Sequence, residues 1–189
     1  VKPRDERGYA LSPEQVQQRI TEYAETPITE IHMVGGVNPR LPYSYYLELL
    51  RAMKEARPTA HLKAFTMIEI VQIQRTAKKP LEEVLSDLKE AGLESLPGGG
   101  AEVFSDRVQE EMFWTKSDSE DWLRIAAAAH RAGLPTNATM LYGHIENTSE
   151  KVYHLTRLRD VQDETGGFLA YIPLSFHPER TEIDHLPGP

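Results

Sequence analysis

The chain has 189 residues, which is enough for one domain and part of a second. Hydrophobic residues make up 40% of it, a composition that excludes disorder as the main state. The 21 Lys and Arg residues are outnumbered by 29 Asp and Glu residues, so the net charge is -8. Because a nucleic-acid-binding surface needs clustered positive charge, the composition argues against a nucleic-acid partner.

The sequence also lacks the marks of membrane insertion and secretion. No apolar run approaches the ~18 residues that a membrane span needs, and the first residues form no apolar signal segment. We therefore expect a cytoplasmic protein without a membrane partner. The chain has no cysteine, which excludes disulfides, thiolate nucleophiles and cysteine-ligated metal within these residues.

Helical and strand-like segments alternate along the chain. A helix is predicted over residues 12–25, where Ser12 and Gln15 form a capping box. Helical periodicity returns after residues 81 and 122, and Gly92 and Gly133 lie where those helices should end. Runs of branched and aromatic residues predict five strands, at 28–34, 61–70, 93–96, 136–142 and 168–176. The alternation predicts an α/β protein with parallel strands and outer helices.

The pattern within the strands favours a barrel over an open sheet. A doubly wound sheet is buried on both faces, so its strands should be almost continuously apolar. Here one side of the predicted strands carries polar residues, namely Glu30, His32, His61, Lys63, Asn137 and Thr139. Such alternation suits a barrel with a partly polar lumen, in which a ligand can bind. The alternative is that these residues lie at strand ends or edges in solvent.

The order of the elements predicts a partial barrel. A helix precedes the first strand, although a crossover helix normally follows one. Five strands also fall short of the eight in a complete (β/α) barrel. We therefore expect residues 1–189 to form one incomplete core barrel, with a first strand before it and the last strands after it. Its open sheet edges predict pairing with another chain, as in a homodimer.

Glycine-rich segments follow the first and third predicted strands, where sites in parallel α/β folds lie. Gly35 and Gly36 follow the first, and residues 98–100 are three consecutive glycines. Their exposed amides suit a ligand, and a turn that needs positive φ is the alternative explanation. The triple glycine lacks the Lys-Ser/Thr of a nucleotide P-loop. The second strand contributes Lys63, Thr66 and Glu69, which either hold a polar ligand or are solvated.

The last two predicted strands both end in His-x-Glu. If they are neighbours, His144, Glu146, His177 and Glu179 could converge on a divalent metal, as in a barrel hydrolase. Otherwise, the two histidines are hydrogen-bonding pocket residues that orient a substrate carboxylate or move a proton. His130 and His154 are predicted on helices, as surface or packing groups.

Five segments in unbroken order resemble the menaquinone-pathway branch of the radical S-adenosylmethionine enzymes. They are HMVGGVNP (32–39), KAFTMIE (63–69), LPGGGAE (96–102), NATMLYGH (137–144) and QDETGGF (162–168). Within this branch, Met33–Val34 and the residues from Pro173 to Pro178 resemble the aminofutalosine synthases more than the dehypoxanthine futalosine cyclases. The deazaflavin-cofactor synthases are further relatives.

The resemblance implies a (β/α) barrel, S-adenosylmethionine and a 4Fe–4S cluster as cofactors, and a small-molecule substrate and an electron donor as partners. The 5′-deoxyadenosyl radical would add to the enolpyruvyl double bond of 3-[(1-carboxyvinyl)oxy]benzoate. Rearrangement and decarboxylation would then give aminofutalosine.

The same resemblance assigns residues to the site. The catalytic residues would be Tyr142, His144 and His177. The cofactor would contact Gly35, Gly36, Thr66, Glu69, Gly98, Gly99, Gly100 and Glu102. The substrate would contact Lys63, Asn137, Thr139 and Phe176.

One departure from the family pattern is large. The family holds its cluster with Cys-x3-Cys-x2-Cys, and this chain contains no cysteine. We therefore expect no metal ligand among these residues and no radical chemistry from this chain alone. The alternatives are a cyclase-like radical enzyme, the metal-dependent hydrolase and a cluster-free nucleoside-binding protein.

Overall fold

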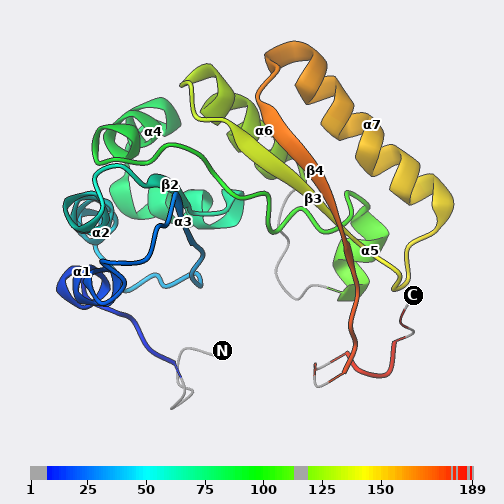
Figure 1. Ribbon diagram of the computed structural model, residues 1–189. Helices are drawn as coiled ribbons and strands as arrows, with labels where there is room; N and C mark the ends of the chain where they lie inside the picture. Colours follow the sequence, from blue (N-terminus) through cyan, green and yellow to red (C-terminus); the bar gives the residue numbers. More distant parts are fainter. Residues whose placement is uncertain (1–7, 113–118, 180, 182, 187, 189) are drawn as a thin grey trace. The chain divides into compact units, whose positions relative to one another are not determined.

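The computed structural model describes residues 8–112, 119–179, 181, 183–186 and 188. The chain divides into two compact units, residues 1–97 and 98–189, each described by itself (Figure 1). No helix in the described part of the chain is both long and apolar enough to cross a bilayer.

The first unit is built around a short parallel pair of strands, β1 and β2. In chain order its elements are α1 (Pro13–Thr21), β1 (Glu30–Met33), α2 (Tyr43–Ala56), β2 (His61–Ala64), α3 (Met67–Ala77) and α4 (Leu81–Glu90). Strand β2 turns Leu62 and Ala64 into the core, where both are fully buried with Leu50 and Val84. The opposite face of the pair is polar, since Glu30 lies opposite His61 and His32 lies opposite Lys63.

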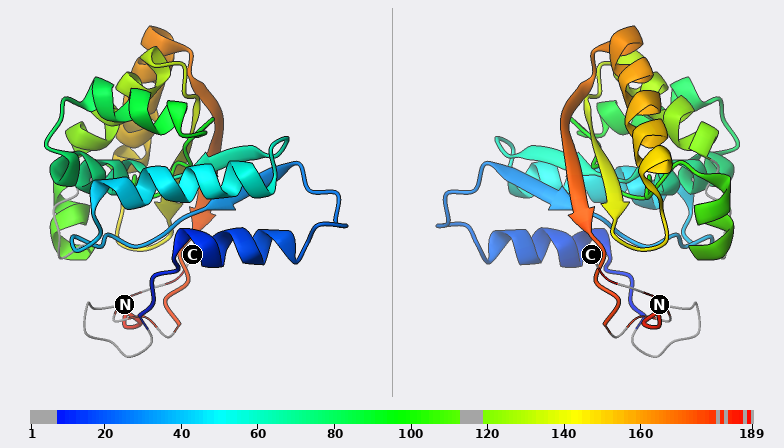
Figure 2. Two further views of the ribbon diagram at one scale, coloured as in Figure 1. Left: turned by 90° about the vertical axis from the view of Figure 1, so that its left-hand side faces the viewer. Right: turned by 90° about the vertical axis from the view of Figure 1, so that its right-hand side faces the viewer.

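The second unit holds a longer parallel pair, β3 and β4, beside α6 and α7 (Figures 1 and 2). Its elements are α5 (Asp106–Met112), α6 (Ser119–Arg131), β3 (Thr136–Tyr142), α7 (Thr148–Thr165) and β4 (Phe168–Ser175). Trp122, Ile125, Ala126 and Ala129 form the buried side of α6, as the apolar spacing predicts. Parallel pairing in both units confirms the predicted α/β class.

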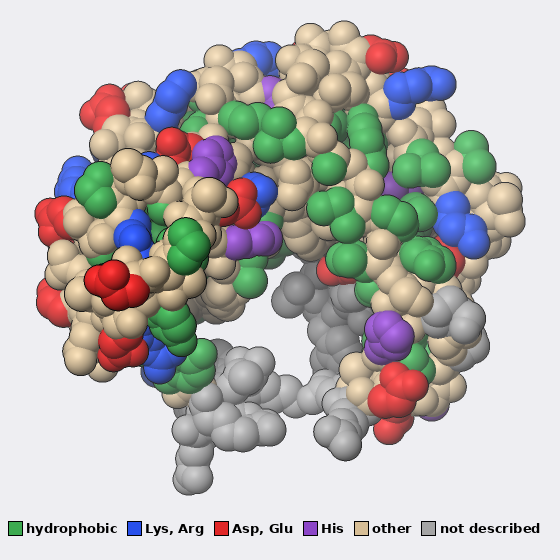
Figure 3. Space-filling model, viewed as in Figure 1, with side chains coloured by type: hydrophobic (Ala, Val, Ile, Leu, Met, Phe, Trp, Pro, Cys, Tyr) green, Lys and Arg blue, Asp and Glu red, His purple; other side chains and the backbone are tan. Residues whose placement is uncertain are grey.

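Strand β4 exposes most of its apolar side chains. Leu169, Tyr171, Ile172 and Leu174 are all exposed, and hydrophobic side chains gather over this strand in Figure 3. A strand this apolar is typical of a sheet covered on both faces. The predicted homodimer remains a prediction.

Helix capping follows the sequence closely. Ser12 and Gln15 form the predicted capping box of α1. Gly92 and Gly133 follow α4 and α6 with φ of 116° and 74°, as expected of glycines just beyond a helix. His130 and His154 lie on α6 and α7, as predicted.

Two predicted strands are wrong in extent. The strand predicted over 61–70 ends at Ala64, because Phe65 turns the chain with a positive φ of 62° and Thr66 caps α3. Residues 93–96 form no extended strand: Ser95 and Leu96 are bridge residues, and Ser95 pairs with Lys63. By contrast, β3 has the predicted bounds, β1 is three residues shorter than predicted, and β4 is one residue shorter.

Gly167 precedes β4 and packs against the imidazole of His130. A Cβ at this position would lie 2.1 Å from His130 Cγ. The ring cannot swing away freely, because it contacts Thr165 Oγ1 at 2.6 Å and Thr136 Oγ1 at 3.0 Å.

We predict that Gly167→Ala lowers the free energy of unfolding by about 1–3 kcal/mol, through overpacking against His130. Gly36→Ala is the control, since its Cβ would meet nothing within 4 Å; we expect a change within about 1 kcal/mol. Urea unfolding measures both. Equal losses would contradict the packing described for Gly167.

Candidate functional site

In the first unit, the Glu69 carboxylate joins the loop after β1 to the start of α3. Its Oε1 accepts a hydrogen bond from the Gly35 amide at 3.0 Å. Its Oε2 accepts from the Thr66 amide at 2.9 Å and from the Thr66 hydroxyl at 3.1 Å. The structure therefore brings three predicted cofactor residues together, and it engages both Glu69 oxygens with the chain's own donors.

Burial sets the electrostatics of this carboxylate. Glu69 is only 7% exposed. Burial raises the pKa of its carboxyl, and the hydrogen bonds from Thr66 and Gly35 partly oppose that rise. Gly36 differs from Gly35, because no atom lies within 4 Å of the position its Cβ would take. The open backbone at Gly36 leaves room for a ligand.

Lys63 lies on the polar face of the β1–β2 pair. Its ammonium bonds Glu30 at 2.9 Å, and this hydrogen bond is the main reason that the pKa of the Glu30 carboxyl is lowered. Beside it, His61 Nε2 lies 2.7 Å from Ser95 Oγ. These contacts keep polar groups on one face of the strands, as the alternation predicts. The contact of Lys63 with a substrate remains a prediction.

In the second unit, the three-glycine segment packs directly on the backbone of β3. A Cβ on Gly98 would lie 2.6 Å from the Asn137 carbonyl oxygen, so this close approach requires glycine. Thr139 Oγ1 donates to the Gly98 carbonyl at 2.6 Å, and Trp122 Nε1 donates to the Gly99 carbonyl at 3.3 Å. Asn137 and Thr139, predicted on the substrate side, here support the glycine segment.

Glu102 ends this segment in an unusual conformation. Its φ is 46°, in the left-handed region that non-glycine residues rarely adopt. The Leu141 amide donates to its carbonyl at 3.0 Å. Burial raises the pKa of its carboxyl. Within the described residues, no hydrogen bond or ion pair reaches that carboxylate, which is therefore free to accept hydrogen bonds from a polar ligand.

His154 also contacts this loop, and the sequence analysis did not predict that contact. It is 0% exposed on α7, where it accepts a hydrogen bond from the Phe104 amide at Nδ1 (3.2 Å) and contacts the Thr139 carbonyl through Nε2 (3.0 Å). The two partners require a neutral ring protonated at Nε2. Burial lowers its pKa to about 4. The signal in the sequence is its spacing, because His154 and Leu158 are one turn apart and form the buried side of α7.

His144 is a packed residue just beyond β3. Its side chain is 0% exposed, and its Nε2 lies 3.0 Å from the Leu141 carbonyl. Phe176, which is 5% exposed, meets it edge to face with 5.8 Å between ring centroids. Both residues are therefore brought together, as predicted, inside the core of the unit. Their contact with substrate remains a prediction.

Glu146 closes the turn that carries His144. Its two oxygens accept from the Gly143 amide at 2.8 Å and the His144 amide at 2.9 Å. Burial raises the pKa of its carboxyl, but these backbone hydrogen bonds outweigh burial and the pKa is lowered overall. His144 Nδ1 lies 3.1 Å from Glu146 Oε2.

The metal-hydrolase alternative is wrong for the described residues. Among them, no group of three or more His, Asp or Glu side chains could hold a metal ion. Glu146 is engaged by backbone amides, whereas His177 and Glu179 are exposed beyond β4. Tyr142 pairs with Ser175 at the ends of β3 and β4. Its catalytic role, like that of His177, remains a prediction.

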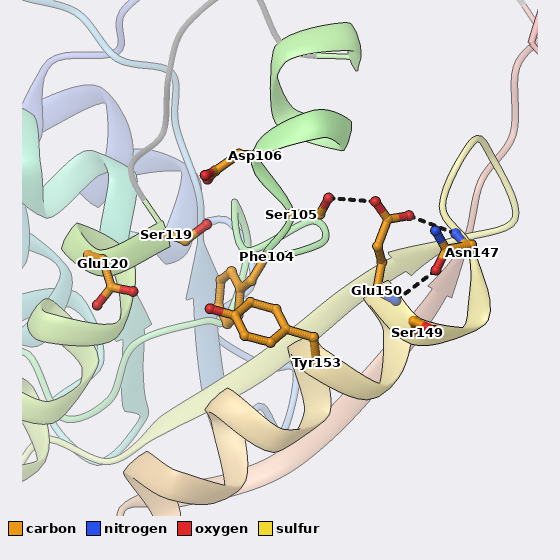
Figure 4. A pocket seen from close by; sticks show the side chains of 9 residues that line it. All are labelled: Phe104, Ser105, Asp106, Ser119, Glu120, Asn147, Ser149, Glu150 and Tyr153. Atoms are coloured by element: carbon orange, nitrogen blue, oxygen red, sulfur yellow. Dashed lines mark hydrogen bonds between the residues drawn. The ribbon is translucent and has the colours of Figure 1, made fainter.

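A pocket of about 640 Å³ opens on the helical side of the second unit (Figure 4). It contains no predicted site residue. Its walls come from residues at and just before the N-terminal ends of α5, α6 and α7, and they include Ser105, Glu150 and Tyr153. The ion pair with Arg107 is the main reason that the pKa of Glu150 is lowered to about 2, and Ser105 donates to the same carboxylate. The Glu150 carboxylate is therefore already engaged by Arg107 and Ser105.

Replacing Glu69 tests its role in joining the two loops. We predict that Glu69→Gln lowers the free energy of unfolding by about 1–3 kcal/mol, because its NH2 group would face a backbone N–H. Glu48→Gln, at an exposed site on α2, is the control and should change stability by less than about 0.5 kcal/mol. Urea unfolding gives both values. A Glu69→Gln protein as stable as the control would contradict the role.

Protonation of His154 should destabilise the fold. Its pKa is about 4 in the folded chain and has its ordinary value of 6.5 in the unfolded chain, so the unfolded chain binds more protons between these pH values. Its contribution to stability is complete above about pH 6.5 and is lost as pH falls toward 4. At about pH 5 we expect a loss on the order of 2 kcal/mol. The free energy of unfolding is measured with urea at about pH 7 and pH 5. Between these pH values, a His154→Leu variant should lose about 2 kcal/mol less of it than the wild type. The same pH dependence in both proteins would contradict the assignment.

Comparison with known proteins identifies close sequence relatives. Aminodeoxyfutalosine synthase of Thermus thermophilus is 45% identical over 179 residues, 95% of this chain and 48% of that protein. The Streptomyces coelicolor protein of the same name is 42% identical, over 96% of this chain and 47% of that protein. A 5-amino-6-(D-ribitylamino)uracil–L-tyrosine 4-hydroxyphenyl transferase of Methanopyrus kandleri is 38% identical, over 92% of this chain and 47% of that protein. The chain thus spans about half the length of the curated relatives it matches.

A solved structure supports the fold. Methylornithine synthase (PylB) aligns with a TM-score of 0.65 at 13% identity, covering 84% of this chain and 44% of that one. At this identity the likeness concerns the fold alone. The family model described as the Radical SAM superfamily matches residues 2–158. This match confirms the resemblance found in the strand-end motifs, and the chain belongs to the Radical SAM superfamily.

Proposed function

We propose that a polypeptide containing this chain is an aminofutalosine synthase of menaquinone biosynthesis. It would transfer the 5′-deoxyadenosyl group of S-adenosylmethionine to 3-[(1-carboxyvinyl)oxy]benzoate to give 6-amino-6-deoxyfutalosine. The carbon–sulfur bond of S-adenosylmethionine would break with release of methionine, and one carboxyl group of the acceptor would leave as carbon dioxide. The observation that carries the proposal is the identity of 45% and 42% to two proteins named aminodeoxyfutalosine synthase, each over at least 95% of the chain. An electron donor would be its partner, and the cytoplasm its location.

Superfamily membership implies S-adenosylmethionine and a 4Fe–4S cluster. The residues of this chain do not fit the cluster, because none of the 189 is a cysteine that could supply a thiolate. They do fit a polar nucleoside ligand. In the second unit, no hydrogen bond or ion pair among the described residues reaches the Glu102 carboxylate, and burial raises its pKa. In the first unit, taken by itself, nothing lies within 4 Å of the position that a Cβ on Gly36 would take.

Within each unit, we assign the chain's own residues to binding and orientation. In the first unit, the loop at Gly35 and Gly36 would meet the cofactor, with Thr66 and Glu69 holding that loop in place. In the second, Glu102 would accept hydrogen bonds from the nucleoside, while Gly98, Gly99 and Gly100 let the backbone approach it. As a proposal for the first unit alone, Lys63 would contact the substrate. As a proposal for the second unit alone, Asn137, Thr139 and Phe176 would contact it, with Tyr142, His144 and His177 as catalytic residues.

The two buried carboxylates, Glu69 and Glu102, differ in their hydrogen-bond partners. The Glu69 carboxylate accepts hydrogen bonds from backbone amides on both oxygens, so we assign it to holding the loop after β1 rather than to binding a ligand. Glu102 is different, since no donor among the described residues reaches its carboxylate, and a ligand hydroxyl would supply one.

The test uses a longer polypeptide that contains this chain and cluster-binding cysteines, with its cluster reconstituted without oxygen. With S-adenosylmethionine, a reductant and 3-[(1-carboxyvinyl)oxy]benzoate, we predict formation of 6-amino-6-deoxyfutalosine, detected by mass spectrometry. Omitting the reductant is the control and should abolish product. Turnover of tyrosine with 5-amino-6-(D-ribitylamino)uracil instead, or turnover of dehypoxanthine futalosine, would overturn the assignment.

A further inference from the structure

Residues 98–104 run beside β3 and are joined to it by hydrogen bonds at both ends. Thr139 Oγ1 donates to Gly98, and the Leu141 amide donates to the Glu102 carbonyl. The third connection runs through a side chain of α7, because the His154 ring lies between the Phe104 amide and the Thr139 carbonyl. His154 therefore connects the end of the loop, the strand and the helix.

The loop needs such a connection because its backbone is strained. Gly100 and Glu102 have φ of 85° and 46°, and a left-handed non-glycine residue persists only where its surroundings hold it. Phe104 lies two residues beyond Glu102, and its ring packs against the His154 imidazole with 4.2 Å between centroids. Both the backbone and the side chain of Phe104 thus rest on His154.

We propose that His154 is a positioning residue that holds residues 98–104 in the conformation that presents the Glu102 carboxylate to an adenosyl-containing ligand. The ligand part of this inference rests on the proposed function. The loop-holding part rests on the hydrogen bonds alone.

A neutral imidazole suits both partners of His154. The Phe104 amide needs an acceptor, the Thr139 carbonyl needs a donor, and both lie in a site without solvent. Leucine would fill similar space and leave both backbone groups unpaired. Asparagine would place its side-chain oxygen near the position of His154 Nδ1. It would therefore accept from the Phe104 amide but leave the Thr139 carbonyl without the donor that His154 Nε2 supplies.

His130 offers a matched control within the same unit. Like His154 it is a helix histidine with two hydrogen-bonding partners, but it is half-buried and its partners are the side chains of Thr165 and Thr136. Burial lowers its pKa to about 4 as well. Its partners lie where α7 ends and β3 begins, outside residues 98–104. His130→Leu should therefore destabilise the fold without releasing the glycine loop.

The experiment compares His154→Leu, His154→Asn and His130→Leu in the longer polypeptide, at a temperature where all are folded. Two quantities are measured for each: the affinity for S-adenosylmethionine by titration calorimetry, and amide hydrogen exchange at Phe104 and Leu141. We expect His154→Leu to weaken the affinity at least tenfold and to speed both exchange rates at least tenfold. His154→Asn should recover part of both losses, and His130→Leu should leave both within about twofold of the wild type.

The outcomes separate the inference from the proposed function. If the wild type binds no S-adenosylmethionine, the proposed function fails, and exchange at Phe104 and Leu141 still decides whether His154 holds the loop. If His154→Leu and His130→Leu lose affinity and protection equally, His154 is merely structural and the inference is overturned. Unchanged exchange at both amides in His154→Leu overturns it as well.

Discussion

The strained backbone at Glu102 is the constraint on which the second unit's candidate site depends. A left-handed glutamate is stable only if neighbouring groups fix it, and Thr139, Leu141 and His154 supply those contacts. The fixed backbone then leaves the Glu102 carboxylate without a partner among the described residues. A strained residue whose carboxylate has no partner among the described residues is a candidate for a preorganised ligand contact.

Three glutamates near strand ends show how position decides chemistry. Glu69 and Glu146 each accept backbone hydrogen bonds on both oxygens, so their carboxylates stabilise turns within their own units. The pKa of Glu146 is lowered by these bonds, whereas burial keeps the pKa of Glu69 raised. Burial also raises the pKa of Glu102, but no such donor reaches its carboxylate among the described residues. We therefore propose Glu102, of these three, as the one that contacts a ligand.

Helix caps and strand bounds are predicted well where the residue types and their spacing give a clear local pattern. The capping box at Ser12 and the bounds of β3 follow directly from residue type and spacing. The strand predicted through residue 70 is wrong, although Thr66 and Glu69 carry the same capping signal as Ser12 and Gln15. The branched residues around them hid it. Hydrogen bonds between distant residues, such as His154 with Phe104, leave no local pattern, so the sequence predicts the site's motifs and misses what holds them.

The central claim is that the Glu102 carboxylate is held ready for a polar ligand. Isotope-edited 13C NMR of glutamate carboxyl carbons, in the longer polypeptide, tests it most directly. On addition of S-adenosylmethionine, the account predicts a shift of the Glu102 signal, assigned from its loss in Glu102→Gln, with little change at Glu146. A Glu102 signal that does not move while the ligand binds would contradict it.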